Sequence, residues 1–364
     1  MEISNFTFIV TDNCNFNCSY CMQKKENKTI SNQTIQNAVE FFYPFFNHEN
    51  STRIAFYGGE PLMAFDKIQF ATRLLFEKNK NNKPDSKKIE FHITTNGSLL
   101  THEMLEFFNL YRFTLLLSFD GLAQDNGRKK DSLESTLLTM KLIQTYAGIS
   151  FEINSVFSPQ TVERLFESIQ YIIEHEGPDI TFNLSITDDW TRQNLETLRI
   201  ELKRLADYVS NHYKKTGHIP VKNFLKNPRG NRNIPLSRKD VFRCSAGRNH
   251  LAITPEAKLW GCFLFHDYFK TRETHPQYPD YSFGDLEYFI ANYKNLYPAI
   301  LTNYEDLRQD FFQAGEVDCF LCTRLSECAV CPVIGAYSTG SIGKIPCCKC
   351  SLLKIESELG CKFF

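Results

Sequence analysis

Strand-like runs alternate with amphipathic helical stretches along the first 220 residues of this 364-residue chain, and this alternation restricts the fold more than any other feature. The six predicted strands are residues 5–11, 53–57, 89–94, 113–119, 150–156 and 179–185. Between them, apolar residues recur at helical spacing over 35–46, 65–78, 102–111, 133–146 and 162–175. Right-handed crossovers between parallel strands curl such a sheet toward a barrel. Because six strands cannot close an eight-stranded barrel, we expect an α/β fold with a partial (β/α)6 TIM-like barrel.

Three cysteines, Cys14, Cys18 and Cys21, follow the first predicted strand within one short loop. Three thiolates can hold three corners of a 4Fe–4S cluster, and since such a cluster normally takes four cysteines, one iron would stay open to another ligand. Structural zinc is the alternative, but zinc takes four ligands, usually in two separated pairs, and neither a histidine nor a fourth cysteine is near. The spacing therefore favours an iron–sulfur cluster.

A glycine turn, Gly58-Gly59-Glu60-Pro61, follows the second predicted strand. Because the ends of successive parallel strands converge at one face of a barrel, we expect this turn to lie beside the cysteine loop. Together the two motifs resemble the radical S-adenosylmethionine (SAM) enzymes, whose three-cysteine loop has an aromatic residue before its last cysteine, here Tyr20. The resemblance implies that the open iron binds the amino and carboxylate groups of SAM, with Gly58, Gly59 and Glu60 holding the amine.

Polar residues at the ends of the later strands extend the resemblance. Asn96 follows the third strand, Ser118 and Asp120 end the fourth, and Asn154 lies in the fifth. Each also fits an ordinary turn or a hydrogen-bonded structural residue. A Thr-Asn-Gly turn followed by a Ser-x-Asp-Gly run is similar to the radical SAM subfamily that carries a SPASM domain. The resemblance implies that these four residues lie at the SAM site and that Ser118 reaches the SAM carboxylate or ribose. In the family an arginine often follows this serine and takes part in the same contact, and Arg128 is its match here.

The other ten of the 13 cysteines lie in the C-terminal third. Cys244 and Cys262 bracket a predicted hairpin with its turn at Pro255. A dense run and a late group follow, comprising Cys319, Cys322, Cys328, Cys331, Cys347, Cys348, Cys350 and Cys361. Two tetra-thiolate sites can be filled from this set, and the spacing alone does not separate zinc from iron–sulfur clusters.

The order of these cysteines resembles the SPASM domain, which holds two auxiliary 4Fe–4S clusters. The resemblance implies a distal cluster on Cys319, Cys322, Cys328 and Cys350, and a proximal cluster on Cys244, Cys262 and Cys331. Either Cys347 or Cys348 completes the proximal site, or one of its irons is open to a substrate thiolate. The interval before Cys331 is two residues where the family has three, and Cys361 fits a thiol outside both clusters.

These motifs divide the chain into a core barrel over 1–220, a linker over 221–240 and a SPASM domain over 241–364. The stretch 222–239 holds six basic residues and no acidic one, which fits a solvated linker or a positively charged lip for an acidic peptide. The formal net charge of −1 gives no basic footprint for nucleic acid. The first residues resemble neither a targeting segment nor a membrane span, so we expect a cytoplasmic protein whose cysteines are metal ligands.

The resemblance implies a radical SAM oxidoreductase that cleaves SAM to a 5′-deoxyadenosyl radical, removes hydrogen from a ribosomally made peptide and installs a thioether or carbon–carbon cross-link. An electron donor such as flavodoxin or ferredoxin would supply the electron. Because the first strand begins near residue 6, a leader peptide would bind another surface or a separate leader-binding protein. The sequence names no residue that quenches the product radical.

Two alternatives remain. An anaerobic sulfatase-maturing enzyme would oxidise cysteine or serine to formylglycine, although the extra cysteine expected between Cys244 and Cys262 in that group is missing. The alternative from another class is a zinc-binding scaffold without catalysis.

Overall fold

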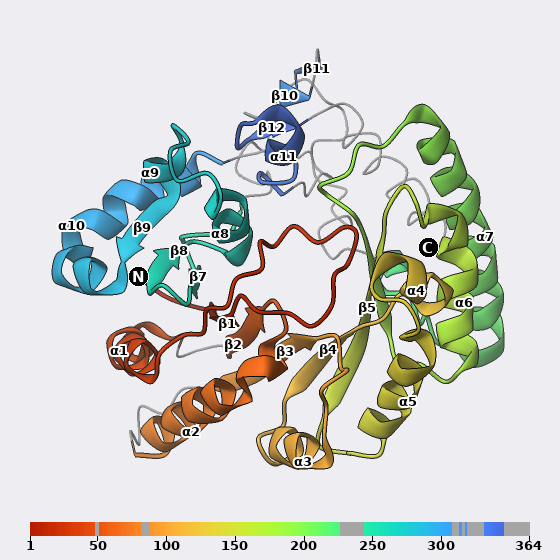
Figure 1. The fold of residues 1–364 in the computed structure, drawn as a ribbon, viewed down its shortest axis with the longest axis horizontal. Coiled ribbons are helices and arrows are strands. Elements are labelled where there is room, and N and C mark those ends of the chain that lie inside the picture. Colours follow the sequence, from red (N-terminus) through yellow and green to blue (C-terminus); the bar gives the residue numbers. More distant parts are fainter. Residues whose placement is uncertain are drawn as a thin grey trace.

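The computed structural model describes residues 1–47, 51–81, 88–225, 244–307, 313–314, 317–318 and 331–345. A nine-stranded sheet runs through these residues in the order β6-β5-β4-β3-β2-β1-β7-β8-β9 (Figure 1). Its first six strands pair in parallel with their sequence neighbours: β1 (Asn5–Thr11), β2 (Thr52–Gly58), β3 (Ile89–Thr95), β4 (Thr114–Ser118), β5 (Ser150–Phe157) and β6 (Ile180–Leu184). The predicted α/β partial barrel is confirmed.

Helices follow the strands and cover the outside of the parallel sheet (Figure 1). They are α1 (Asn32–Phe42), α2 (Phe65–Asn81), α3 (His102–Leu110), α4 (Gln124–Gly127), α5 (Leu133–Gln144), α6 (Leu165–Glu174) and α7 (Arg192–Thr216). The helix expected over 35–46 begins earlier because the Ser31 side chain caps it by accepting from Thr34 N. It ends earlier because Tyr43–Phe45, with Pro44, forms a 3-10 turn. Within the described residues, no helix has both the length and the hydropathy to cross a bilayer.

The C-terminal region continues the barrel sheet. β7 (His250–Ile253) pairs in parallel with β1, and β8 (Lys258–Trp260) pairs antiparallel with β7 and with β9 (Ser282–Asp285). The hairpin predicted with its turn at Pro255 is therefore confirmed. The remaining elements are α8 (Phe263–Phe269), α9 (Tyr278–Tyr281), α10 (Leu286–Glu305), β10 (Gln313–Ala314), β11 (Val317–Asp318), α11 (Ala336–Thr339) and β12 (Lys344–Ile345).

The three-cysteine loop leaves β1 and crosses the open side of the barrel, between α8 on one side and α4 on the other (Figure 1). Residues 226–243 lie outside the described residues, and they include most of the predicted linker over 221–240. The proposed domain boundaries stay predictions.

A stack of phenylalanine rings forms the centre of the core. Phe8 in β1 lies opposite Phe56 in β2, and their ring centroids are 5.9 Å apart. Phe56 stacks on Phe113 at 6.0 Å, and Phe113 stacks on Phe91 at 5.3 Å. All four side chains are buried. The stack joins strands that are distant in the sequence, so it fixes the relative positions of β1, β2, β3 and β4.

We expect Phe56→Ala to lower the free energy of unfolding by about 3–5 kcal/mol, because it opens a cavity inside this stack. Phe76→Ala is the matched control, since Phe76 is 51% exposed on α2. Urea unfolding of the cluster-free chain, followed by circular dichroism, measures both. Equal losses from the two variants would contradict the role given to the stack.

Candidate active site

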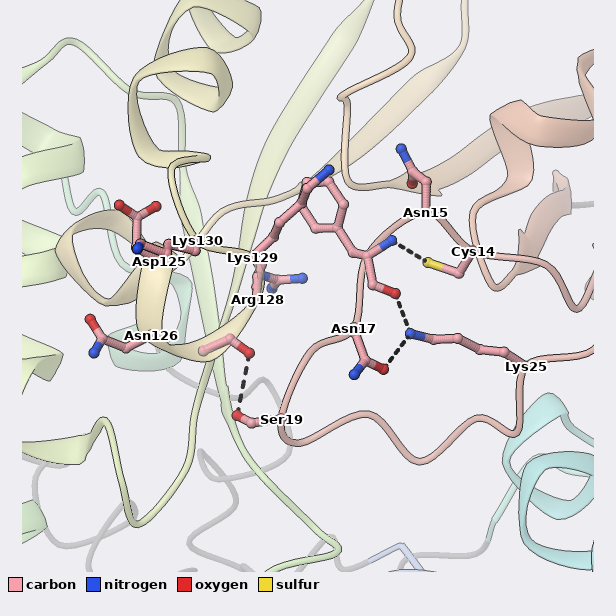
Figure 2. Close-up of a pocket in the computed structure, with 12 residues that line it drawn as sticks. Cys14, Asn15, Asn17, Ser19, Lys25, Asp125, Asn126, Arg128, Lys129 and Lys130 are labelled. Atoms are coloured by element: carbon pink, nitrogen blue, oxygen red, sulfur yellow. Dashed lines mark hydrogen bonds between the residues drawn. The ribbon is translucent and has the colours of Figure 1, made fainter.

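Backbone hydrogen bonds hold the three-cysteine loop against the barrel. Ser19 N donates to the Gly127 carbonyl at 2.8 Å, and Cys21 N donates to the Cys18 carbonyl at 3.2 Å. The Ser19 hydroxyl donates to the same Gly127 oxygen at 3.3 Å (Figure 2). Gly127 ends α4, so these bonds join the loop to the segment that follows β4. The loop is thus fixed at the carboxyl end of the parallel strands.

The thiols of Cys14, Cys18 and Cys21 lie close enough to influence one another's titration. Burial raises the pKa of all three, to about 11 for Cys18, where the positive charge of Arg128 opposes the rise. The thiols are therefore neutral at pH 7 in the cluster-free chain. Iron binding has to release their protons, since the thiolate is the ligand form.

The spacing of the sulfur atoms tests whether these cysteines fit a single ion. Among the residues that the structure describes, no three cysteine sulfurs all lie within 4.8 Å of one another. Around tetrahedral zinc, with Zn–S bonds of about 2.3 Å, sulfur atoms are about 3.8 Å apart. In the cluster-free chain the three sulfurs of the loop are therefore not gathered as they would be around one zinc ion.

Two glycines bring the end of β2 into contact with the cysteine loop. Gly58 has φ of +146°, and a Cβ there would lie 2.1 Å from the Thr11 oxygen. A Cβ on Gly59 would lie 2.3 Å from the Asn13 oxygen. Without these side chains, Gly59 N donates to Thr11 O at 2.9 Å and Glu60 N donates to Asn13 O at 2.8 Å. The glycines are needed because only a bare backbone can approach so closely.

The Glu60 carboxylate lies under this turn with 1% of its surface exposed. Its Oε1 accepts from the Thr95 hydroxyl at 2.7 Å and from Leu62 N at 3.0 Å. Its Oε2 accepts from Asn96 N at 2.8 Å. Burial raises the pKa of Glu60, while these hydrogen bonds oppose the rise. A carboxylate offers about four acceptor sites, so one site, on Oε2, has no donor among the described residues.

The turn after β3 is tied to the cysteine loop by side chains. Asn96 Nδ2 donates to Asn15 Oδ1 at 2.9 Å, and Asn15 Nδ2 donates to the Ser98 hydroxyl at 2.8 Å. Ser118 and Asn154 lie opposite each other on β4 and β5, further along the same edge. The carboxyl ends of β1 to β5 therefore all contribute polar residues to this face of the barrel.

Three of the residues predicted as SAM contacts, Tyr20, Asp120 and Arg128, interact with one another. Asp120 is fully buried and accepts from the Tyr20 hydroxyl at 2.5 Å and from Arg128 Nη2 at 2.8 Å. Val156 N donates to the same carboxylate at 2.8 Å. Arg128 also lies over the Tyr20 ring, 5.5 Å from its centroid. Arg128 Nε is buried without a hydrogen-bond partner among the described residues, so one N–H remains for an anionic ligand.

A cavity of about 550 Å³ opens between the cysteine loop and residues 125–130 (Figure 2). Cys14 and Arg128 line it, and Lys25, Lys129 and Lys130 add positive charge. Cavities of this volume accept ligands of cofactor size. The unpaired Arg128 N–H fits a carboxylate such as that of SAM. The positive lining does not favour SAM as a whole, because its sulfonium and ammonium outweigh its carboxylate. Of the residues predicted at the cluster and the SAM site, Cys14 and Arg128 line this cavity.

A second group of cysteines comes together in the C-terminal region. Burial raises the pKa of Cys262 well above its ordinary value, and the neighbouring Cys244 and Cys331 raise it further. Burial also raises the pKa of Cys331, to about 12. The structure thus gathers the three cysteines assigned to the proximal cluster. The others proposed as ligands, Cys319, Cys322, Cys328, Cys347 and Cys350, lie outside the described residues.

Comparison with known proteins decides the family. The model of the radical SAM superfamily matches residues 8–199, more than half of the chain. The chain belongs to the radical SAM superfamily. Enzymes of this superfamily use a 4Fe–4S cluster and SAM, which agrees with the three-cysteine loop and the cavity beside it.

Solved structures of radical SAM proteins share the fold well beyond the barrel. Native anSMEcpe with bound AdoMet superposes with a TM-score of 0.74 at 17% identity, covering 98% of this chain and 96% of that chain. Streptococcus suis SuiB bound to precursor peptide SuiA gives a TM-score of 0.62 at 16% identity, covering 94% of this chain and 75% of that one. The likeness therefore includes the C-terminal region.

Curated relatives match at higher identity over shorter spans. Radical SAM cyclopropyl synthase TigE of Paramaledivibacter caminithermalis is 27% identical over 298 residues, which cover 74% of this chain and 59% of TigE. An uncharacterized protein of Methanocaldococcus jannaschii is 30% identical over 181 residues, which cover 48% of this chain and 60% of that protein. The chain spans about three fifths of the length of these relatives.

Sequence reasoning missed the polar residues of α8 beside the radical SAM loop. Asp267 is 5% exposed, and its Oδ2 has no hydrogen-bond partner among the described residues. Its side chain is hydrogen-bonded with Gln23, and burial raises its pKa to about 7. The available signal was an aspartate that follows a histidine inside the aromatic run of α8, where an unpaired charge is costly. Asp267 therefore lies beside the loop that carries Cys21.

We expect Gly59→Ala to lower the free energy of unfolding by about 3 kcal/mol, because the new methyl group collides with the Asn13 backbone. Gly217→Ala is the control: Gly217 also lies outside a helix, at the end of α7, but nothing lies within 4 Å of its Cβ position. Its expected loss is about 1 kcal/mol, from the left-handed backbone alone. Urea unfolding of the cluster-free variants compares them, and equal losses would refute the close-approach explanation.

Proposed function

We propose that this chain is a radical SAM peptide maturase that oxidatively cross-links a ribosomally made peptide through a thioether or carbon–carbon bond. The observation that carries the proposal is the presence of two separate cysteine groups on one chain. Cys14, Cys18 and Cys21 form the first, and Cys244, Cys262 and Cys331 form the second. One group suffices to cleave SAM, so a second group favours a reaction that also takes an electron from the substrate.

When bound, the 4Fe–4S cluster and SAM supply a primary carbon radical that can remove hydrogen from an unactivated carbon. The chain's own residues would bind SAM and orient it. The remaining Oε2 site of Glu60 would accept from the SAM amine, and Arg128 Nε would donate to its carboxylate. Asp120 keeps Arg128 and Tyr20 in place for this task. Because the amine and the carboxylate of SAM are both carried by its α-carbon, Glu60 and Arg128 would hold that end of the methionyl group and so limit where the sulfonium can lie.

Related proteins support a peptide substrate. SuiB is described in complex with precursor peptide SuiA, and anSMEcpe in complex with the Cp18Cys peptide. TigE is described as a cyclopropyl synthase. An electron donor of the flavodoxin or ferredoxin class, and a separate leader-binding protein, belong to the same proposal.

Formylglycine formation is the second candidate function. The fold of anSMEcpe covers 98% of this chain. A cysteine-type anaerobic sulfatase-maturating enzyme of Clostridium novyi is 24% identical over 42% of the chain. The similarity to sulfatase-maturing enzymes is limited to the fold and to less than half of the sequence, and it fits both candidates. The experiment therefore has to separate them by the mass of the product and by whether the product contains an aldehyde.

The proposal is tested by anaerobic incubation of the reconstituted protein with SAM, a reductant and short peptides encoded beside its gene. Intact mass should show the loss of two hydrogens from one peptide, together with 5′-deoxyadenosine. Conversion of a cysteine to formylglycine would instead replace its sulfur by oxygen, and conversion of a serine would also remove two hydrogens but leave an aldehyde that reacts with hydroxylamine. Either product would support the second candidate. Deoxyadenosine without a mass change in any peptide would contradict the maturase proposal.

Variants of the two cysteine groups should separate their roles. We expect Cys18→Ala to abolish deoxyadenosine formation, because only two thiolates remain on the loop. Cys262→Ala should retain deoxyadenosine formation but lose the cross-linked product. Chromatography of deoxyadenosine and peptide mass measure the two effects. Continued SAM cleavage by Cys18→Ala would refute the assignment of the loop.

A further inference from the structure

One lysine of the C-terminal region holds both ends of the three-cysteine loop. Lys270 follows α8, and its Nζ lies 2.5 Å from Asp12 Oδ2. The same ammonium donates to the Lys24 carbonyl at 3.1 Å. Asp12 precedes Cys14 by two residues, and Lys24 follows Cys21 by three. A single cation therefore spans the base of the loop.

The contact between Lys270 and Asp12 is buried. The two side chains are 8% and 6% exposed. Removing one partner of a buried ion pair leaves an uncompensated charge and costs much more than breaking a surface pair. Lys270 is thus placed where its loss would act strongly on the loop.

Other charges nearby do not replace this contact. Lys28 follows the three-cysteine loop, and its Nζ lies 2.7 Å from Oε1 of Glu256, in the turn between β7 and β8. The Lys28 side chain is 48% exposed, however. Oxygen atoms of Asp12, Glu26 and Glu256 lie within 4.8 Å of one another, as in a cation site. Three lysines, Lys24, Lys28 and Lys270, pair with these three carboxylates, so the lysines take the place that a metal ion would have.

The helix that carries this contact begins at the second cysteine group. Cys262 occupies the position that caps α8 at its start. Asp267, in the middle of the helix, is hydrogen-bonded with Gln23, two residues after Cys21. The ring of Phe263 lies 4.2 Å from that of Tyr57, which precedes the Gly58-Gly59 turn. The short helix therefore carries Cys262 at its start, where Phe263 contacts β2, and reaches the radical SAM loop toward its end through Asp267 and Lys270.

We propose that Lys270 is a positioning residue that fixes both ends of the three-cysteine loop and, through α8, ties this loop to Cys262. The functional meaning rests on the proposed assignment of Cys14, Cys18 and Cys21 to the SAM-binding cluster. The predicted effect of Lys270 on the position of the loop does not rest on that assignment, because it depends only on contacts within the chain.

Hydrogen exchange of the cluster-free full-length chain tests the proposal, with Lys270→Met, Lys270→Arg and Lys258→Met compared with the unsubstituted protein. Methionine keeps the length of the side chain without its charge. Arginine keeps the charge and can reach both acceptors. Lys258→Met is the matched control, since Lys258 lies in the same region but pairs with Glu273, which is 62% exposed.

The informative amides are those hydrogen-bonded within the loop and to its neighbours, at Asp12, Ser19, Cys21 and Glu26. In Lys270→Met we expect them to exchange at least about tenfold faster, with little change in β3 to β6, because the loop opens locally. Lys270→Arg should restore the original rates, and Lys258→Met should match the unsubstituted chain. Loop amides that exchange at the original rate in Lys270→Met would overturn the proposal, as would a uniform acceleration across the whole protein.

Thiol labelling gives an independent reading on the same cluster-free variants. We expect iodoacetamide to alkylate Cys18 faster in Lys270→Met, while the rate at Cys244 stays unchanged. Asp12→Asn should reproduce the effect, because it removes the other partner. These readouts need no SAM cleavage, so a failure of the maturase proposal and a failure of this one are distinguishable. Unchanged labelling of Cys18 in both variants would overturn the positioning role.

Discussion

The close approach of two backbones at the carboxyl ends of β1 and β2 is the constraint on which the rest of the site depends. Gly58 and Gly59 let the β2 turn lie against the cysteine loop, at distances that a Cβ would forbid. Glu60 then enters the core and binds Thr95 and the backbone of Asn96. Three successive strand ends are thereby joined, and the loop acquires its shape from the barrel before any iron binds.

Buried charges complete this arrangement on both sides of the loop. Asp120 and Arg128 form an ion pair at one side, and Asp12 and Lys270 form one at the other. Both pairs link segments that are far apart in the sequence. Buried thiols between them are neutral at pH 7, because burial raises the pKa of each. Cluster assembly therefore couples metal binding to proton release within a loop whose backbone is already anchored.

The sequence predicted the elements whose signals are local, and it missed contacts that depend on the whole fold. Strand runs and the Pro255 turn were found because their patterns are short-range. Arg128 was expected to bind SAM, and the sequence did not predict its ion pair with Asp120, which forms because Arg128 follows α4 and also donates to the Asn154 carbonyl in β5. Lys270 and Lys24 are 246 positions apart, and no spacing rule joins them. They meet because β7 pairs with β1 and brings α8 over the loop.

The central claim is that the loop after β1 holds a 4Fe–4S cluster separate from those of the C-terminal cysteines. Iron and acid-labile sulfide contents of the reconstituted wild type and of a variant with Cys14, Cys18 and Cys21 all changed to Ala test it most directly. The account predicts about twelve iron atoms per chain in the wild type and about eight in the variant, with sulfide in equal amount. Equal iron in both proteins, or zinc without labile sulfide, would contradict it.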